Sequence, residues 1–213
     1  MPPFRRSASF VRFLAGGGRL DPDDDGFFAA LAEHRFRGIE DAASEETSVG
    51  WVSPGDPSGG ELGREHLVFE DLVWLRIRID RKRLPPAWRA IWLAAEVRAR
   101  GGRPPAARER KAILADVERK VLPRVLPSVR LVDVVVDPAE ATVLLFSTAN
   151  AVEVECARLF RATFGVTLER ADPGALAARL GLEDTLRDLA PLALNASQRP
   201  VVRPRRAAEE ASR

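Results

Sequence analysis

The chain contains a single cysteine, Cys156, among its 213 residues. It can therefore form neither an intrachain disulfide nor a cysteine-based zinc cluster, and a reducing cytoplasm is the expected compartment. Long apolar runs are also missing, since none approaches the roughly 18 residues that a membrane-spanning helix needs. The stretch Phe10–Ala15 is too short for the core of a signal peptide and contains Arg12. We expect no export and no membrane anchor.

Familiar catalytic patterns are scarce as well. The two histidines, His34 and His66, lie far apart in the sequence without a nearby ligand pattern, and no serine or cysteine occupies a nucleophile-elbow setting. The triplet Gly16–Gly18 lacks the later glycine, lysine and hydroxyl residue of phosphate-binding loops. Cys156 shares a helical face with apolar residues, which favours packing over reactivity. We expect no catalytic residue, no bound metal and no cofactor.

One acidic segment, Asp21–Gly26, matches the first half of a calcium-binding loop, with acids at positions 1, 3 and 5 and glycine at 6. Position 12, which should be a bidentate glutamate, is Ala32, and no helix precedes the loop because Gly16–Gly18 stand there. We interpret the segment as an acidic start of a helix that interacts with the helix dipole.

Two Glu-x-Lys triplets, Glu109–Lys111 and Glu118–Lys120, resemble the acid and lysine pair of metal-dependent nucleases. Both fall inside a helical period, where residues i and i+2 point apart, whereas that chemistry needs the pair on a strand. Asp133 and Asp137 would be the candidate carboxylates. A metal-dependent DNA exonuclease is therefore the enzymatic alternative rather than the leading hypothesis.

Positive charge is concentrated in the middle of the chain. Residues 76–130 hold 16 Arg and Lys against 5 Asp and Glu, a balance of +11 in a chain whose formal charge is +2. Residues 1–75 and 131–194 are net negative, at −7 and −5, and residues 195–213 carry +3. Segregation on this scale indicates a polyanionic partner that one surface attracts and others repel.

Hydrophobic periodicity predicts an α+β fold. Strands are expected at Ser9–Leu14, Val49–Val52, Leu67–Ile79, Val129–Val136, Thr142–Ser147 and Val166–Glu169. Helices are expected from Asp21–Asp25 to near Phe36, at Pro86–Arg100, Ala106–Leu122, Ala149–Phe164, Gly174–Leu180 and Glu183–Leu189. The order suggests two small antiparallel-sheet and helix modules joined by a basic helical hairpin.

The corresponding domain prediction has five parts. They are an N-terminal α+β module at 1–83, the basic hairpin at 84–125, a β-β-α-β module at 126–172, short helices at 173–194 and a disordered basic tail at 195–213.

Within the hairpin, Arg108, Lys111 and Arg119 fall on the side of the second helix opposite its apolar stripe. Trp88 and Trp92 fall on the apolar stripe of the first helix, so we expect them in a core rather than as platforms for base stacking. Binding to a nucleic-acid backbone without sequence preference is the function that this pattern favours.

Three short features occur in an informative order: Gly50-Trp51-Val52 after a β-α start, Leu122-Pro123-Arg124 closing a long basic helix, and a hairpin and helix over Asp137–Gly165 followed by Val166. Over about residues 9–172 the chain resembles a shortened member of the bacterial recombination-associated RdgC family. The resemblance implies a nucleoid-associated protein that encircles double-stranded DNA as a ring-like homodimer, without sequence specificity, and limits access of a RecA-type recombinase.

Carried onto this sequence, the resemblance and the charge pattern give a DNA-contacting set of Arg76, Arg78, Arg81, Lys82, Arg108, Lys111, Arg119 and Arg124. The Leu-Pro-Arg turn would lie near a subunit contact. The chain departs from the family at Leu126, where a phenylalanine is usual, at Asn150-Ala151, where a lysine pair is usual, and in being shorter by about a domain. A protein-interaction module whose basic face meets an acidic protein is the third hypothesis.

Overall fold

The computed structural model describes residues 8–18, 20–42, 46–182 and 184. The chain divides into two units, Met1–Ala171 and Asp172–Arg213. The second unit contains helix α6 (Pro173–Arg179), which Asp172 caps by accepting a hydrogen bond from the Ala175 amide at 2.8 Å. The expected tail from Asn195 and nearly all of the helix expected at Glu183–Leu189 lie outside the described residues.

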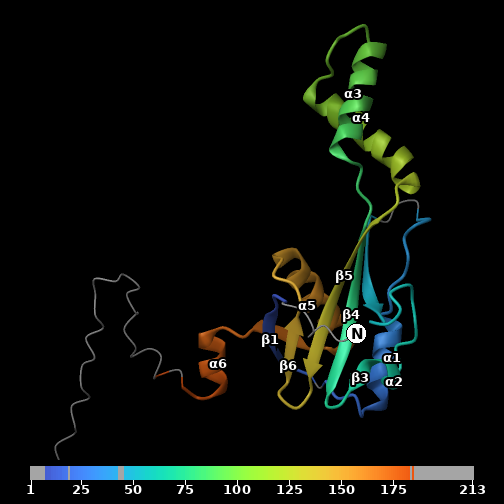
Figure 1. Cartoon of the computed structure of the whole chain (residues 1–213). Helices are drawn as coiled ribbons and strands as arrows, with labels where there is room; N and C mark the ends of the chain where they lie inside the picture. The colour runs from blue at the N-terminus through green and yellow to red at the C-terminus, as the bar shows by residue number, and fades with distance from the viewer. Residues whose placement is uncertain (1–7, 19, 43–45, 183, 185–213) are drawn as a thin grey trace, which may run out of the picture. The chain divides into compact units, whose positions relative to one another are not determined.

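The strands among the described residues of the first unit form one seven-stranded antiparallel sheet (Figure 1). Its strands are β1 (Val11–Gly16), β2 (Thr47–Val52), β3 (Val68–Phe69), β4 (Leu72–Arg81), β5 (Ser128–Asp137), β6 (Thr142–Leu145) and β7 (Thr167–Arg170). The order is β2-β4-β5-β6-β1-β7, and β3 pairs with β4 beside this path. The α+β prediction is confirmed, but strands expected in two separate modules share a single sheet.

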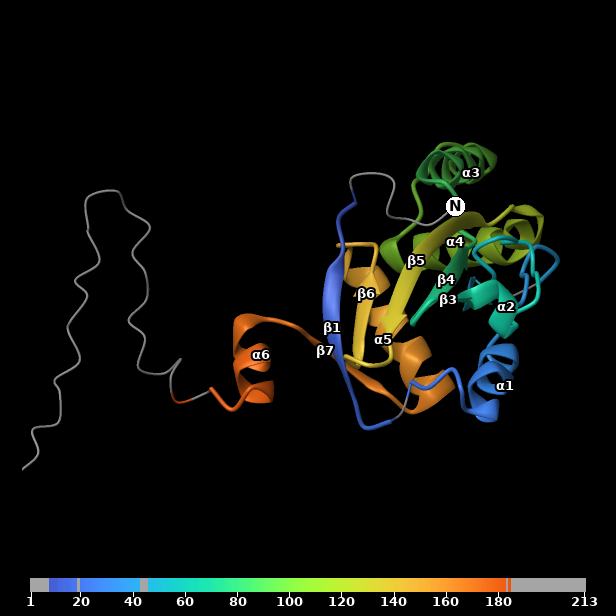
Figure 2. The same cartoon turned by 60° about the horizontal axis from the view of Figure 1, so that its bottom comes forward.

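The helices of this unit are α1 (Asp25–Glu33), the short α2 (Arg64–Leu67), α3 (Pro86–Ala99), α4 (Ala107–Val121), the 3₁₀ turn η2 (Leu122–Arg124) and α5 (Asn150–Phe164). Helix α5 crosses one face of the sheet (Figure 2). Helix α1 packs beside it, where the rings of Phe27 and Phe164 stack with centroids 4.8 Å apart. The Asp24 side chain accepts a hydrogen bond from the Gly26 amide, so an aspartate caps α1, in agreement with the interpretation of the acidic segment.

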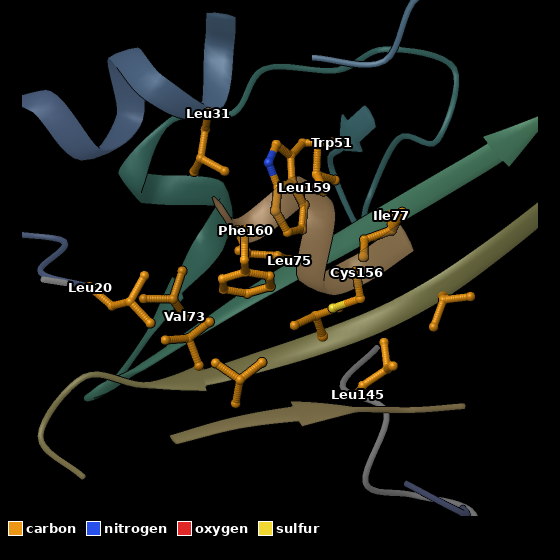
Figure 3. Close-up of a cluster of buried hydrophobic side chains, with 14 of the residues drawn as sticks. Leu20, Leu31, Trp51, Val73, Leu75, Ile77, Leu145, Cys156, Leu159 and Phe160 are labelled. Atoms are coloured by element: carbon orange, nitrogen blue, oxygen red, sulfur yellow. The ribbon is translucent and has the colours of Figure 1, made fainter. Parts of the chain in front are cut away.

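The core lies between α5 and the sheet (Figure 3). Alternate residues of β4 and β5 point into it, because successive side chains of a strand face opposite sides of the sheet. Leu75, Ile77 and Val134 are buried there against Cys156 and Phe160 of α5. The other face of β4 carries Trp74, Arg76, Arg78 and Asp80, so the two arginines share one face with Asp80.

Trp51 anchors α5 to the sheet. Its side chain is fully buried, its indole Nε1 donates to Thr163 Oγ1 at 2.8 Å, and its ring meets Phe160 edge-on at 5.3 Å. The neighbouring Gly50 permits a close approach: a Cβ there would lie 2.4 Å from the Cα of Phe36. The Gly-Trp pair is thus explained by local packing, since a side chain at position 50 would push the 35–36 segment away.

The sequence prediction of one strand over Leu67–Ile79 is wrong in detail. Leu67 closes α2, and the residues between β3 and β4 form a turn in which Glu70 has a φ of 56°. A two-residue hairpin turn needs this left-handed conformation, which the alternation of apolar residues does not reveal. The end of α5 is better marked, because Gly165 takes the left-handed C-cap with a φ of 67°.

Helices α3 and α4 form a hairpin that we call the arm, residues 84–125. It continues from the ends of β4 and β5 and lies beyond the sheet (Figure 1). Pro85 and Pro86 begin α3, and Pro123 lies in η2 at the end of α4, so prolines mark both connections to the sheet. Leu84 and Leu122 are buried at this junction.

Replacing Thr163 by valine should lower the free energy of unfolding by about 1–3 kcal/mol, because the buried Trp51 indole N–H loses its acceptor. Urea denaturation measures this change. Thr167→Val is the matched control, since Thr167 is exposed and its hydroxyl donates to Gly16 O at 3.1 Å, and it should change stability by less than about 0.5 kcal/mol. Equal effects of the two substitutions would contradict the role given to the Trp51–Thr163 contact.

Burial, assisted by the charge of Glu153, raises the pKa of the Cys156 thiol to about 12. Because the thiolate is the reactive form, thiol reagents at pH 8 should modify the folded protein at least about 100-fold more slowly than the urea-unfolded protein. The neutral thiol favours the folded state, so this contribution to stability is complete below the unfolded pKa of about 8.5 and is lost as the pH rises through 12. Equal modification rates would show that the site opens readily.

Candidate nucleic-acid interface

The arm carries an exposed basic face. On α4, Ile113, Val117 and Val121 are half-buried on the side toward α3, as the periodicity predicts. Arg108, Lys111 and Arg119 are exposed and fall on the opposite, outward side of the same helix. From Arg108 to Arg119 the helix rises by about 16 Å, which exceeds the width of about 12 Å of the major groove of DNA. One helix face can therefore reach phosphates on both sides of a groove.

Ion pairs within the arm occupy its four acidic residues. Arg100 binds Glu96 and Glu109, and Arg89 binds Glu118 at 2.5 Å across the two helices. Asp116 accepts from Lys120 at 2.7 Å and lies 3.8 Å from Arg119. The hydrogen bond from Arg100 holds the pKa of Glu109 below its usual value, and that from Lys120 does the same for Asp116. With ten basic and four acidic residues, the arm has a formal net charge of +6.

Several arm cations make no ion pair with any described residue. They are Arg98, Arg103, Arg108, Arg110, Lys111 and Arg124, all of them exposed. Arg110 and Lys111 line a groove of about 470 Å³ together with Arg89, Leu114 and Glu118. The DNA-contacting set predicted from the sequence omits Arg103 and Arg110, because its members on α4 were chosen for lying opposite the apolar stripe of that helix. Both arginines are included in the excess of positive charge counted over residues 76–130.

Arg76 is bound by groups of the sheet and of the loop that follows β2. Its Nε donates to Asp133 Oδ1 at 2.7 Å across the β4–β5 ladder, and its Nη1 donates to Pro54 O at 2.8 Å. Trp74 Nε1 donates to the same carboxylate oxygen at 3.1 Å. The Arg76 and Asp133 side chains are only 19% and 23% exposed. The positive charge of Arg76 is therefore balanced within the fold.

Arg78 and Lys82 are held in the same way. Arg78 binds both carboxylate oxygens of fully buried Asp80, and its guanidinium lies 4.2 Å from the centre of the Phe36 ring. The hydrogen bond to Asp80 raises the pKa of Arg78 above its usual value. Lys82 is 1% exposed, and its Nζ donates to the carbonyl oxygens of Glu40 and Ala42. These cations support the loops that cover this face of the sheet.

The remaining two predicted contacts lie at the junction of sheet and arm. Arg81 points toward the helix-covered face, where its Nη2 lies 3.7 Å from Glu155 Oε1 of α5. Arg124 is exposed in η2. The eight-residue DNA-contacting set stays a prediction. Four of its members, in or next to β4, bind groups of the sheet, of α5 or of the loops that cover the sheet, and the other four are exposed on the arm.

Asp133 and Asp137, the carboxylates that the sequence offers to a metal-dependent nuclease, both lie on β5 and not on the arm. Asp133 is bound by Arg76 and Trp74, and Asp137 accepts from the Glu140 amide at 3.0 Å. Among the described residues, one group has ligand atoms within 4.8 Å of one another: Glu61, Glu65 and His66, all exposed. This group lies at α2, at the end of β4 away from the arm (Figure 1).

The match to known protein families covers most of this architecture. A family model described as "Putative exonuclease, RdgC" matches residues 18–173, more than half of the chain. The chain belongs to the RdgC family. The matched region of this RdgC protein includes the arm and every strand from β2 to β7. Comparison with curated proteins gives no match.

RdgC membership supports a recombination-related role for the protein. In the part of the chain that the structure describes, no helix is long and apolar enough to cross a membrane.

Replacing Arg76 by glutamine should lower the free energy of unfolding by about 1–3 kcal/mol, because the partly buried Asp133 carboxylate loses its charged partner. The slope of log K for duplex binding against log salt should not change. Arg108→Gln is the matched control and should do the reverse, with little effect on stability and a slope smaller by about 0.9. A reduced slope for Arg76→Gln would show that Arg76 contacts DNA.

Proposed function

We propose that this RdgC protein binds double-stranded DNA without sequence preference, associates with the nucleoid in the cytoplasm and limits the access of a RecA-type recombinase by occupying the duplex. The observation that carries the proposal is the outward face of α4, where Arg108, Lys111 and Arg119 are exposed together on an arm of net charge +6. Phosphate neutralisation by such a face releases counterions, which supplies most of the free energy of nonspecific binding.

The composition of the arm supports backbone binding over base readout. Residues 84–125 contain no Asn, Gln, Ser, Thr or His. Several of the side chains that proteins use to read base edges are therefore missing. The acidic side chains of the arm, which could also read bases, are held in ion pairs, and its arginines and lysines also bind phosphate. The net negative charge of residues 1–75 repels DNA from that part of the chain and so favours binding at the arm.

We propose that the protein binds as a homodimer. The outward face of one α4 can contact only one side of a duplex, whereas two copies provide two such faces. A clamp of this kind needs no chemical step on the DNA, and we propose that the protein is not an enzyme. The engagement of Asp133 by Arg76 and Trp74 supports this, since a carboxylate bound in that way is a poor metal ligand.

Replacing Arg108, Lys111 and Arg119 together by alanine should weaken binding to every duplex sequence tested. If each neutralises one phosphate, the slope of log K against log salt should decrease in magnitude by about 2.7. Fluorescence anisotropy with two unrelated duplexes measures both quantities. The salt concentration would be varied over a range of about fourfold, from 50 to 200 mM, because affinity depends steeply on salt in this range.

The matched control removes three other exposed arginines, Arg12, Arg37 and Arg161, which lie outside the arm and make no ion pair with a described residue. Its net charge equals that of the arm variant, so it separates a local contact from a general loss of positive charge. An unchanged slope for the arm variant, or an equal loss of DNA affinity in both triple variants, would show that the outward face of α4 is not part of the DNA site.

Because the description of the matching family model names an exonuclease, nuclease activity needs its own test. End-labelled duplex should be retarded by the protein without shortening in the presence of Mg²⁺ or Mn²⁺. Progressive shortening that is abolished by Asp133→Asn or Asp137→Asn would establish the metal-dependent alternative.

A further inference from the structure

Two groups of exposed side chains lie outside the proposed DNA contact. On α3, Trp88 and Trp92 are 52% and 41% exposed, so the expectation that both belong to a core is wrong for the single chain. At the other end of β4, Glu61, Glu65 and His66 are gathered at α2. This second group brings an imidazole and two carboxylates together, and these are side chains that bind metal ions.

The His66 imidazole is close to both carboxylates. Its Nε2 lies 3.3 Å from Glu65 Oε1 and 3.9 Å from Glu61 Oε2, and one ligand atom of each residue lies within 4.8 Å of the other two. Ligand atoms at roughly 2.0–2.2 Å around a tetrahedral zinc ion are about 3.3–3.6 Å apart. The three side chains therefore need only small movements to coordinate one ion.

Two buried leucines hold the backbone that carries these ligands. Leu62 follows Glu61 and is 5% exposed, Leu67 follows His66 and is fully buried, and both belong to the main hydrophobic core. Between them, the His66 amide donates to Gly63 O at 3.1 Å, at the start of α2. Because the backbone is already fixed, metal binding has to order little more than the ends of three side chains.

Gly63 provides the space in which the Glu65 carboxylate lies. A Cβ at position 63 would be only 2.5 Å from Glu65 Oε1. The φ of Gly63 is −84°, a value that any residue can adopt, so the backbone conformation itself does not require glycine. Any larger residue at this position would therefore displace the carboxylate without straining the chain.

The two carboxylates lack a cation that would balance their charge. Neither forms an ion pair with a lysine or arginine of the described residues, and Arg64 binds Asp23 Oδ1 at 2.7 Å and Pro22 O at 2.8 Å instead. With a neutral imidazole, two negative charges then lie close together. A divalent cation between them would replace this repulsion by attraction.

We propose that Glu61, Glu65 and His66 bind a zinc ion. One imidazole nitrogen and two carboxylate oxygens form a donor set that suits zinc, whereas Mg²⁺ and Ca²⁺ prefer oxygen ligands alone. The three side chains leave the fourth position of the ion to water. The ion joins the loop before α2 to the helix itself, at the end of β4 away from the arm (Figure 1).

The expectation of no bound metal came from the absence of familiar ligand patterns in the sequence. Glu61, Glu65 and His66 lie within six residues of one another, but their spacing corresponds to none of the common zinc motifs. What brings the ligand atoms together is the turn that ends at α2 and the space at Gly63, and neither can be read from the residue types.

Isothermal titration calorimetry of the chelator-treated protein with zinc chloride tests the proposal. The unmodified chain should bind one zinc ion, and His66→Gln should weaken binding at least about tenfold because it removes a ligand. The matched control is His34→Gln, since His34 lies at the end of α1 with its Nδ1 3.2 Å from Ala30 O, and it should keep full affinity. No measurable binding, or equal affinities of the two histidine variants, would overturn the site.

A second pair of variants tests the geometry without removing a ligand. Gly63→Ala should weaken zinc binding because its methyl group displaces the Glu65 carboxylate. Gly55→Ala in the same loop meets no atom closer than 3.8 Å and should bind zinc like the unmodified chain. Both should unfold at similar temperatures without zinc, and excess zinc should raise the unfolding temperature of Gly55→Ala more. Equal zinc affinities of the two variants would contradict the arrangement.

Zinc binding should be independent of DNA binding. His66→Gln should bind duplex DNA with the salt dependence of the unmodified chain, and the variant without Arg108, Lys111 and Arg119 should bind zinc with unchanged affinity. Loss of zinc binding in the arm variant would show that the ion binds at the arm and would overturn the site at α2.

Discussion

The long antiparallel ladder between β4 and β5 is the constraint on which the rest of the structure depends. It runs without interruption from Val73 opposite Val136 to Arg81 opposite Ser128. One face of the ladder supplies the apolar residues beneath α5, and the other pairs Arg76 with Asp133. Because the same two strands lead into and out of the arm, their pairing also fixes where α3 and α4 begin and end.

The cations of the middle region serve two purposes. Those in or next to β4, such as Arg76, Arg78 and Lys82, neutralise carboxylates or bind carbonyl oxygens of loops that cover the sheet. Those on α4 lie on a helix with no buried residue and point to solvent. Only the second group can exchange its counterions for phosphate without breaking contacts that hold the fold.

Local patterns predicted the helices and most strands, because the arm, α5 and the hairpin of β5 and β6 follow from periodicity and turn residues. Pairings between distant residues were beyond that reasoning. Arg76 and Asp133 are 57 positions apart, and nothing near either residue indicates the other. The union of two expected modules into one sheet depends on the same β4–β5 pairing. The tryptophans of α3 show a related limit, since periodicity identifies an apolar stripe but not the surface that covers it.

The central claim is that the outward face of α4 contacts duplex DNA, and protection of side chains from chemical modification tests it most directly. The unmodified protein would be treated with arginine- and lysine-specific reagents, with and without a saturating duplex, and each site quantified by mass spectrometry. The account predicts that DNA protects Arg108, Lys111 and Arg119 while Arg12, Arg37 and Arg161 stay as reactive as in the free protein. Protection of the second set without the first would contradict it.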